Sequence, residues 1–193
     1  MNKDWTGNSR SAHATLGARN YALEERETND YYATHPSAAQ DLMRIRPDIN
    51  NIWECACGEG HLAKEFDKQG KLHRATDLFD RGYGVPNFDF LTQVGVYDGW
   101  IVTNPPYYAQ EFCEKAIETS GNVAMFLKIQ FLEGKRRKKF FEKYPPGDIY
   151  VYSFRQRCAM NGDFEKYAKS NAVSYAWYIW EKDNKDLPTI HWI

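Results

Sequence analysis

Four consecutive residues, Asn104-Pro105-Pro106-Tyr107, follow an apolar run and have the types that amine chemistry requires. The amino group of an aromatic base is a poor nucleophile because its lone pair is delocalised into the ring. The Asn104 side chain and the Pro105 carbonyl would accept its two N–H groups and draw the nitrogen towards a tetrahedral geometry. Tyr107 would offer a flat face to a base lifted out of a duplex. The alternative is a rigid Pro-Pro turn with a buried tyrosine.

A second group of residues has the order of a nucleoside-binding site. Glu54 precedes a turn that contains Gly58 and Gly60, and Asp77 ends the next predicted strand. Glycines let the backbone approach a ligand closely, and an acid after the second strand can accept both hydroxyls of a ribose. Glu54 could hold a cationic amino group. Because Ala63 stands where a third glycine would be, the turn alone is equally typical of a structural turn. Turn and acid together indicate a nucleoside-containing cofactor.

With both motifs present, the chain resembles the amino-methyltransferases of nucleic acids, specifically the compact DNA N6-adenine methyltransferases of phages and mobile elements. Besides the motif at 104–107, the resemblance includes the segments 30–36 (DYYATHP) and 14–18 (ATLGA). It implies S-adenosylmethionine as the cofactor, DNA as the partner and N6 of adenine in a flipped base as the methyl acceptor. It also implies a phage, prophage or mobile-element protein that acts in the cytoplasm of a bacterial host.

The resemblance assigns the methionine end of the cofactor to two segments. The segment 30–36 would close over it, and the glycine turn would line it. Two departures affect these segments: the turn reads Cys-Gly-Glu-Gly, and His35 stands where many members have Asp or Pro. The residues assigned in this way are Tyr32, Thr34, Pro36, Glu54, Ala56, Gly58 and Gly60.

The nucleoside end of the cofactor is assigned by the same resemblance. Asp77 would hold the ribose. In the segment 88–90, Asp89 would hold the adenine amino group and Phe90 would pack on the adenine ring.

Strands alternate with helices along most of the chain. The alternation predicts an α/β fold in which a mostly parallel sheet carries helices on both faces. Two late strands without a crossover helix between them predict an antiparallel pair at one edge. The resemblance names this fold as the Rossmann-like class I methyltransferase fold. Helices are predicted over 37–43, 61–69, 110–119 and 134–144, and strands over 51–56, 71–77, 100–103, 122–129, 148–154 and 172–181.

The 193 residues suit one catalytic domain at 31–193, preceded by an irregular N-terminal arm at 1–30 and without a separate target-recognition domain. No run of eighteen apolar residues and no signal sequence is found, so we expect a soluble, cytoplasmic protein. The four cysteines have no metal-binding spacing and are interpreted as reduced thiols, so no metal is expected. The aromatic run at 175–180 alternates like a packed strand and is assigned to the core.

The formal net charge of -1 conceals an unbroken run of five cations. Such a run is typical either of a surface that contacts phosphates or of a solvated helix face. Two arginines at the end of a late strand are further candidates for contacts with phosphates or guanine edges, or are ordinary surface charges. The residues proposed to contact nucleic acid are Lys135, Arg136, Arg137, Lys138, Lys139, Arg155 and Arg157.

Several activities remain open beside N6-adenine methylation. N4 of cytosine, adenine in RNA and a protein glutamine all present an amine or amide nitrogen to the same kind of loop. A non-catalytic DNA-binding protein of the same fold is a further alternative. Methylation of cytosine C5 is disfavoured, because it needs a nucleophilic cysteine, usually after proline, and the chain has no Pro-Cys pair.

Overall fold

The computed structural model describes residues 32–106, 109–156, 158–160, 164, 173–184 and 186–193. The N-terminal arm at 1–30 and the motif residue Tyr107 therefore lie outside the described residues, as does Arg157. No helix in the described part of the chain is long and apolar enough to cross a membrane.

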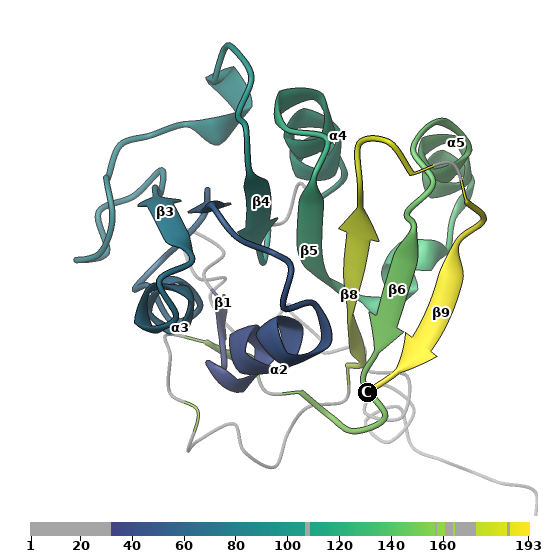
Figure 1. Ribbon diagram of the computed structural model, residues 1–193, viewed down its shortest axis with the longest axis horizontal. Helices are drawn as coiled ribbons and strands as arrows, with labels where there is room; N and C mark the ends of the chain where they lie inside the picture. Colours follow the sequence, from purple (N-terminus) through teal and green to yellow (C-terminus); the bar gives the residue numbers. More distant parts are fainter. Residues whose placement is uncertain (1–31, 107–108, 157, 161–163, 165–172, 185) are drawn as a thin grey trace, which may run out of the picture.

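A seven-stranded sheet in the order β3-β2-β4-β5-β8-β6-β9 forms the centre of the molecule (Figure 1). Six strands run parallel, and β8 alone is antiparallel to both of its neighbours. This confirms the predicted mostly parallel sheet. The strands are β2 (Ile52–Glu54), β3 (Leu72–Ala75), β4 (Trp100–Thr103), β5 (Val123–Lys128), β6 (Asp148–Val151), β8 (Tyr175–Trp180) and β9 (Thr189–Trp192).

Central strands form here because their side chains are apolar on both faces, as parallel sheets covered by helices require. In β5, Ala124 and Phe126 pack in one core cluster, whereas Val123, Met125 and Leu127 pack in the other. The aromatic strand β8 divides in the same way, and all six of its residues are buried. The assignment of its aromatic side chains to the core is confirmed.

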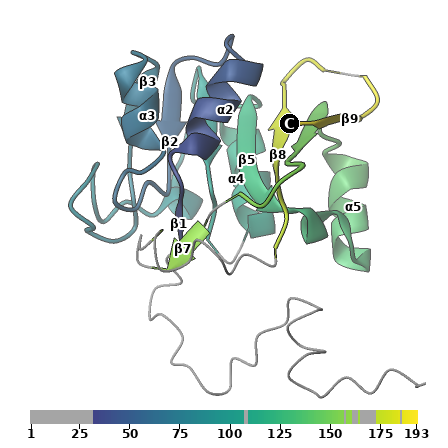
Figure 2. The same ribbon diagram turned by 90° about the horizontal axis from the view of Figure 1, so that it is seen from below.

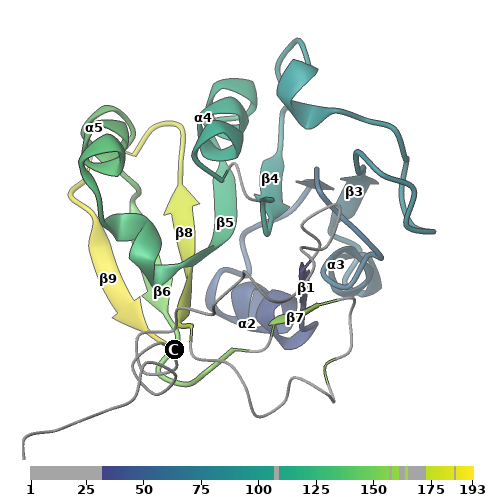
Figure 3. The ribbon, with the colours of Figure 1, turned by 180° about the vertical axis from the view of Figure 1, so that it is seen from behind.

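Helices cover the two faces of the sheet. Figures 1 and 3 both place α4 (Ala109–Thr119) and α5 (Lys135–Lys143) on one side, and α2 (Ser37–Ile45) and α3 (Ala63–Lys68) on the other. The core clusters agree, since Leu42 and Phe66 pack in one of them, and Phe112 and Phe140 in the other. Two short 3-10 helices, η1 (Phe90–Thr92) and η2 (Ile129–Leu132), also lie on the α4 side.

The late strands pair as predicted, with one addition. β6 and β8 form the expected antiparallel pair, and the arrow of β8 points against those of β6 and β9 (Figure 1). However, β9 continues the sheet in parallel beyond β6, so β8 lies inside the sheet rather than at its margin. β9 was not among the strands predicted from the sequence.

A small ribbon of β1 (Tyr32–Thr34) and β7 (Cys158–Met160) was also not predicted. The two strands pair antiparallel, with Thr34 opposite Cys158, and they lie side by side in Figure 2. Strands of three residues are too short to show an alternating pattern. The ribbon joins the segment before α2 to the loop after β6.

Candidate functional site

Asn104 follows β4 directly and contacts the small ribbon. Its amide nitrogen Nδ2 lies 2.8 Å from the hydroxyl oxygen of Thr34 and 3.5 Å from the carbonyl oxygen of Tyr32. Pro105 is buried and Pro106 half-buried beside it. The structure therefore brings the segment 32–34 to the Asn-Pro-Pro motif, a contact that the sequence analysis missed.

The glutamate at the end of β2 is buried. Glu54 is 2% exposed, and its carboxylate accepts a hydrogen bond from the backbone of Ala63. Its second oxygen, Oε2, has no hydrogen-bond partner among the described residues. Burial raises the pKa of Glu54 well above its usual range, and the nearby charge of Asp77 raises it further, while the hydrogen bond from Ala63 lowers it. A buried carboxylate oxygen without a partner fits a site that receives a cation.

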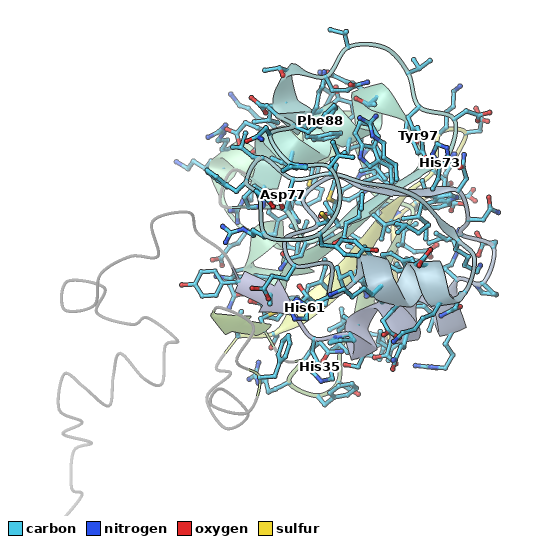
Figure 4. All side chains as sticks on the ribbon, turned by 90° about the vertical axis from the view of Figure 1, so that its left-hand side faces the viewer. His35, His61, His73, Asp77, Phe88 and Tyr97 are labelled. Atoms are coloured by element: carbon cyan, nitrogen blue, oxygen red, sulfur yellow. The ribbon has the colours of Figure 1, made fainter. Side chains whose placement is uncertain are left out.

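Asp77 ties the glycine turn to the segment after β3. Its Oδ2 accepts a hydrogen bond of 2.7 Å from the backbone of Gly58, and its Oδ1 accepts one of 2.9 Å from the backbone of Phe79. Gly58 has a φ of 54°, which glycine adopts without strain. Each carboxylate oxygen keeps a further lone pair for a hydroxyl donor. Figure 4 shows Asp77 between Phe88 and His61 at the β3 end of the sheet.

Gly60 packs against a neighbouring ring, and its assignment to the cofactor stays a prediction. Its φ is 79°, and a Cβ atom built there would lie 2.4 Å from a ring carbon of Tyr83. The absence of a side chain at Gly60 therefore admits the Tyr83 ring. Ala56, between Glu54 and Gly58, is half-buried and packs at the margin of the α4-side core.

Asp89 and Phe90 differ in exposure, although they are adjacent in the sequence. Asp89 is exposed and caps η1, where its Oδ1 accepts a 2.9 Å hydrogen bond from the backbone of Leu91. Phe90 is buried, with its ring centre 5.4 Å from that of Trp53 and 5.2 Å from that of Phe112. Its ring thus packs within the core in this structure, and its assignment to the adenine ring stays a prediction.

Two apolar side chains next to Asp77 were missed by the sequence analysis. Leu78 is 50% exposed and Phe79 is 40% exposed. Both follow the acid directly, and this pair of adjacent apolar residues is a signal that the sequence does contain. They are candidates to contact a flat ring attached to a ribose held by Asp77.

Pro36 lines a surface cavity of about 420 Å³ beside α3, together with His61, Lys64 and Tyr83. His35 and His61 both make edge contacts with the ring of Phe164, at centroid distances of 5.0 Å and 5.3 Å. Burial lowers the pKa of His61, and the charge of Glu59 partly offsets this effect. The cavity adjoins the glycine turn through Tyr83, which packs on Gly60.

The basic run forms α5, and some of its cations are paired. Arg136 forms a 2.6 Å ion pair with Glu111, in the first turn of α4. Arg137 lies over the ring of Phe131 and donates to the carbonyl of Gln130.

Other side chains of α5 extend into solvent. Lys138 lies 3.7 Å from Glu142, one helical turn further on. Lys135 and Lys139 are exposed, and neither has an ion pair with any described residue. Part of the predicted basic surface is therefore committed to contacts within the protein.

Arg155 lies after β6, and its guanidinium contacts the hydroxyl of Ser174 at the start of β8. Both residues line a cavity of about 220 Å³ with Tyr152 and Phe154. All four cysteine side chains are buried and form no disulfide.

Comparisons with known proteins identify the fold. No family model and no curated protein matches the sequence. A Pyrococcus horikoshii protein assigned to the RNA methyltransferases aligns with 91% of this chain and 99% of its own length, at 14% identity and a TM-score of 0.59. A Thermoplasma acidophilum protein aligns over 77% of this chain and 89% of its own, at 15% identity and a TM-score of 0.51.

The M protein of the type I restriction enzyme EcoKI is also similar. It aligns with 82% of this chain at 11% identity and a TM-score of 0.56, and this chain spans 45% of its length. At these identities the similarity concerns the fold. The chain therefore has the Rossmann-like fold of the class I methyltransferases.

Proposed function

We propose that this protein is a DNA methyltransferase that uses S-adenosylmethionine to methylate N6 of adenine. The proposal combines the chemistry of the Asn-Pro-Pro-Tyr motif with the fold. The single observation that carries it is the arrangement of three polar side chains at the carboxyl edge of the sheet. Glu54 ends β2, whereas Asp77 follows β3 and Asn104 follows β4, and these three strands are adjacent and parallel. In open α/β sheets this edge is where ligands bind.

The residues at this edge fit the proposed cofactor. The Glu54 oxygen that has no partner within the described part of the chain suits the ammonium group of the methionine part. Asp77 has lone pairs for the ribose hydroxyls, and exposed Leu78 and Phe79 offer apolar contacts for the adenine. When bound, S-adenosylmethionine would supply a methyl group on a positively charged sulfur. Residues of this chain would hold the adenine amine so that it faces the methyl group.

Asn104 and Pro105 would perform that task. Their oxygens accept the two N–H groups of the adenine amine, so its lone pair points at the methyl carbon. The amine nitrogen would form a bond to the methyl carbon as the bond from carbon to sulfur breaks, so the cofactor would supply the methyl group and a neutral thioether as the leaving group. The amine then releases one proton to water, since an amide oxygen is too weak a base to hold it. Proximity and alignment account for much of the rate of such a displacement.

DNA as the substrate is supported by the position of the cations. α5 follows β5 and η2 on the α4 side of the sheet, and Arg136 pairs with Glu111 in the first turn of α4. Exposed Lys135 and Lys139 are available to phosphates. Arg155 follows β6, which runs parallel to β4, so it lies at the carboxyl edge of the sheet, as Asn104 does.

The proposal is tested by expressing the chain in bacteria that lack their own adenine methyltransferases. Nucleosides from genomic DNA and from total RNA are then analysed by mass spectrometry. We expect N6-methyladenine in DNA and none when Asn104 is replaced by alanine. N4-methylcytosine, or methylated adenine confined to RNA, would contradict the substrate while leaving the fold intact.

A further inference from the structure

Thr34 is held in place by burial and by strand pairing. It is 4% exposed and sits at the end of β1, opposite Cys158 of β7 in the ladder between the two strands. Burial raises the pKa of the Cys158 thiol to about 11, and hydrogen bonds from Tyr175 and Thr34 limit the rise. The hydroxyl oxygen of Thr34 has lone pairs that can accept a hydrogen bond from a neighbouring donor.

That donor is the Asn104 amide. Nδ2 lies 2.8 Å from Oγ1 of Thr34, and 3.5 Å from the carbonyl oxygen of Tyr32. A backbone carbonyl can only accept a hydrogen bond, so the nitrogen of the carboxamide must face β1. The amide oxygen, on the opposite branch of the same planar group, therefore faces away from β1.

We propose that Thr34 is a positioning residue, whose hydroxyl holds the Asn104 carboxamide with its oxygen directed at the substrate amine. The proposal rests on the proposed function, because only an amine acceptor gives this orientation a purpose. It replaces the role that resemblance gave to Thr34, which was contact with the cofactor. A flipped carboxamide would present N–H donors to an amine that itself needs acceptors.

The test compares Thr34→Val, which has the same shape without the hydroxyl, with Thr34→Ser, which keeps it. We expect Thr34→Val to lower kcat roughly tenfold, the factor for one hydrogen bond of ordinary strength. KM for S-adenosylmethionine should stay unchanged, and Thr34→Ser should restore kcat. A raised KM for the cofactor with unchanged kcat would overturn the proposal in favour of the cofactor role.

Repeating the Thr34→Val change in an Asn104→Asp protein separates an effect on the orientation of the residue 104 side chain from an effect on folding. In Asn104→Asp both side-chain oxygens accept, so no wrong orientation exists, and adding Thr34→Val should change kcat by much less than in the parent. The same reduction in both backgrounds would indicate a general structural role and contradict the proposal.

A readout without catalysis completes the test. Nuclear magnetic resonance of the side-chain amide of Asn104 should show protons protected from exchange in the parent and in Thr34→Ser, but not in Thr34→Val. Equal protection in all three proteins would overturn the proposal, even if Asn104→Asp is too slow to assay. If the parent protein methylates no substrate, the proposed function fails, whereas the amide spectra still report whether Thr34 orients Asn104.

Discussion

At the scale of single residues, Glu54 shows the conflict between stability and binding most clearly. One oxygen of this buried carboxylate has no partner among the described residues, so the charged form is disfavoured in the folded protein. A group like this costs stability unless a ligand supplies the missing charge. Our account therefore predicts that a change which removes the charge stabilises the protein but weakens cofactor binding.

Glu54→Gln removes the charge and keeps the shape of the side chain. Because the folded-state pKa is raised, the folded protein binds more protons than the unfolded chain between the usual glutamate pKa and the raised value. The free energy of unfolding of the parent thus falls as the pH rises through this window, whereas the glutamine variant shows no such fall. Thermal unfolding should give a higher melting temperature for the variant at pH 8, with a smaller difference near pH 4. Calorimetry should show affinity for S-adenosylmethionine lower by about tenfold or more.

Glu65→Gln is the matched control. Hydrogen bonds from Gln40 and Lys68 lower the pKa of Glu65, so its contribution to stability is present above the usual glutamate pKa and is lost as the pH falls. This variant should be less stable than the parent at pH 8, the opposite sign, and should bind the cofactor normally. A Glu54→Gln protein that is destabilised at pH 8 would refute the assignment of an unpaired buried charge.

At the scale of elements, the glycine turn is held by contacts with other loops. Gly60 supports the Tyr83 ring at a positive φ, and Asp77 accepts a hydrogen bond from Gly58. The sequence indicated the turn and the acid, since glycine and aspartate have distinct local preferences. It contained no signal for the contact of Tyr83 with Gly60, because that packing depends on how a separate loop returns to the turn.

Gly60→Ala and Gly70→Ala test this packing. Both positions have positive φ, but nothing lies within 4 Å of a Cβ atom at Gly70. Gly70→Ala should cost the backbone strain alone, about 1 kcal/mol. Gly60→Ala should cost about 1–3 kcal/mol more, the usual range for overpacking. Urea unfolding midpoints measure both, and adding Tyr83→Ala to Gly60→Ala should recover part of the difference. Equal destabilisation at the two glycines would show that the ring moves aside freely.

The short strands β1 and β7 were not predictable from the sequence, in contrast to the longer strands. The longer strands were predictable, because β5 is apolar from Val123 to Leu127 and β8 consists of aromatic and apolar residues between Ser174 and Glu181. β1 and β7 have three residues each and form only because each pairs with the other. Consequently, the sequence indicated Asn104 from its motif but could not predict that Thr34 would be its neighbour.

At the scale of the whole molecule, charge is distributed unevenly although the formal net charge is only -1. The parallel strands bring Asp77, Glu54 and Asn104 to one edge. The alternation of strands and helices was enough to predict this convergence. The pairing of Arg136 with Glu111 was not predictable, because it joins the first turns of two different helices.

The salt dependence of DNA binding tests whether the exposed lysines of α5 contact phosphates. Replacing Lys135 and Lys139 together by alanine should reduce the slope of log affinity against log salt by about 0.9 for each phosphate that is no longer neutralised. Lys182→Ala is the matched control, since Lys182 is an exposed cation outside α5, after β8 and next to Asn122. An unchanged slope in the double variant would assign α5 to the solvated surface instead.

In the proposed reaction, Asn104 presents an adenine amine for methyl transfer. The most direct test of this step uses purified protein, S-adenosylmethionine with a labelled methyl group, and duplex DNA, followed by identification of the labelled nucleoside. We predict label in N6-methyladenine, a rate lower by about a hundredfold or more for Asn104→Ala, and unchanged cofactor affinity in that variant. Label in another product, or full activity in Asn104→Ala, would contradict the account.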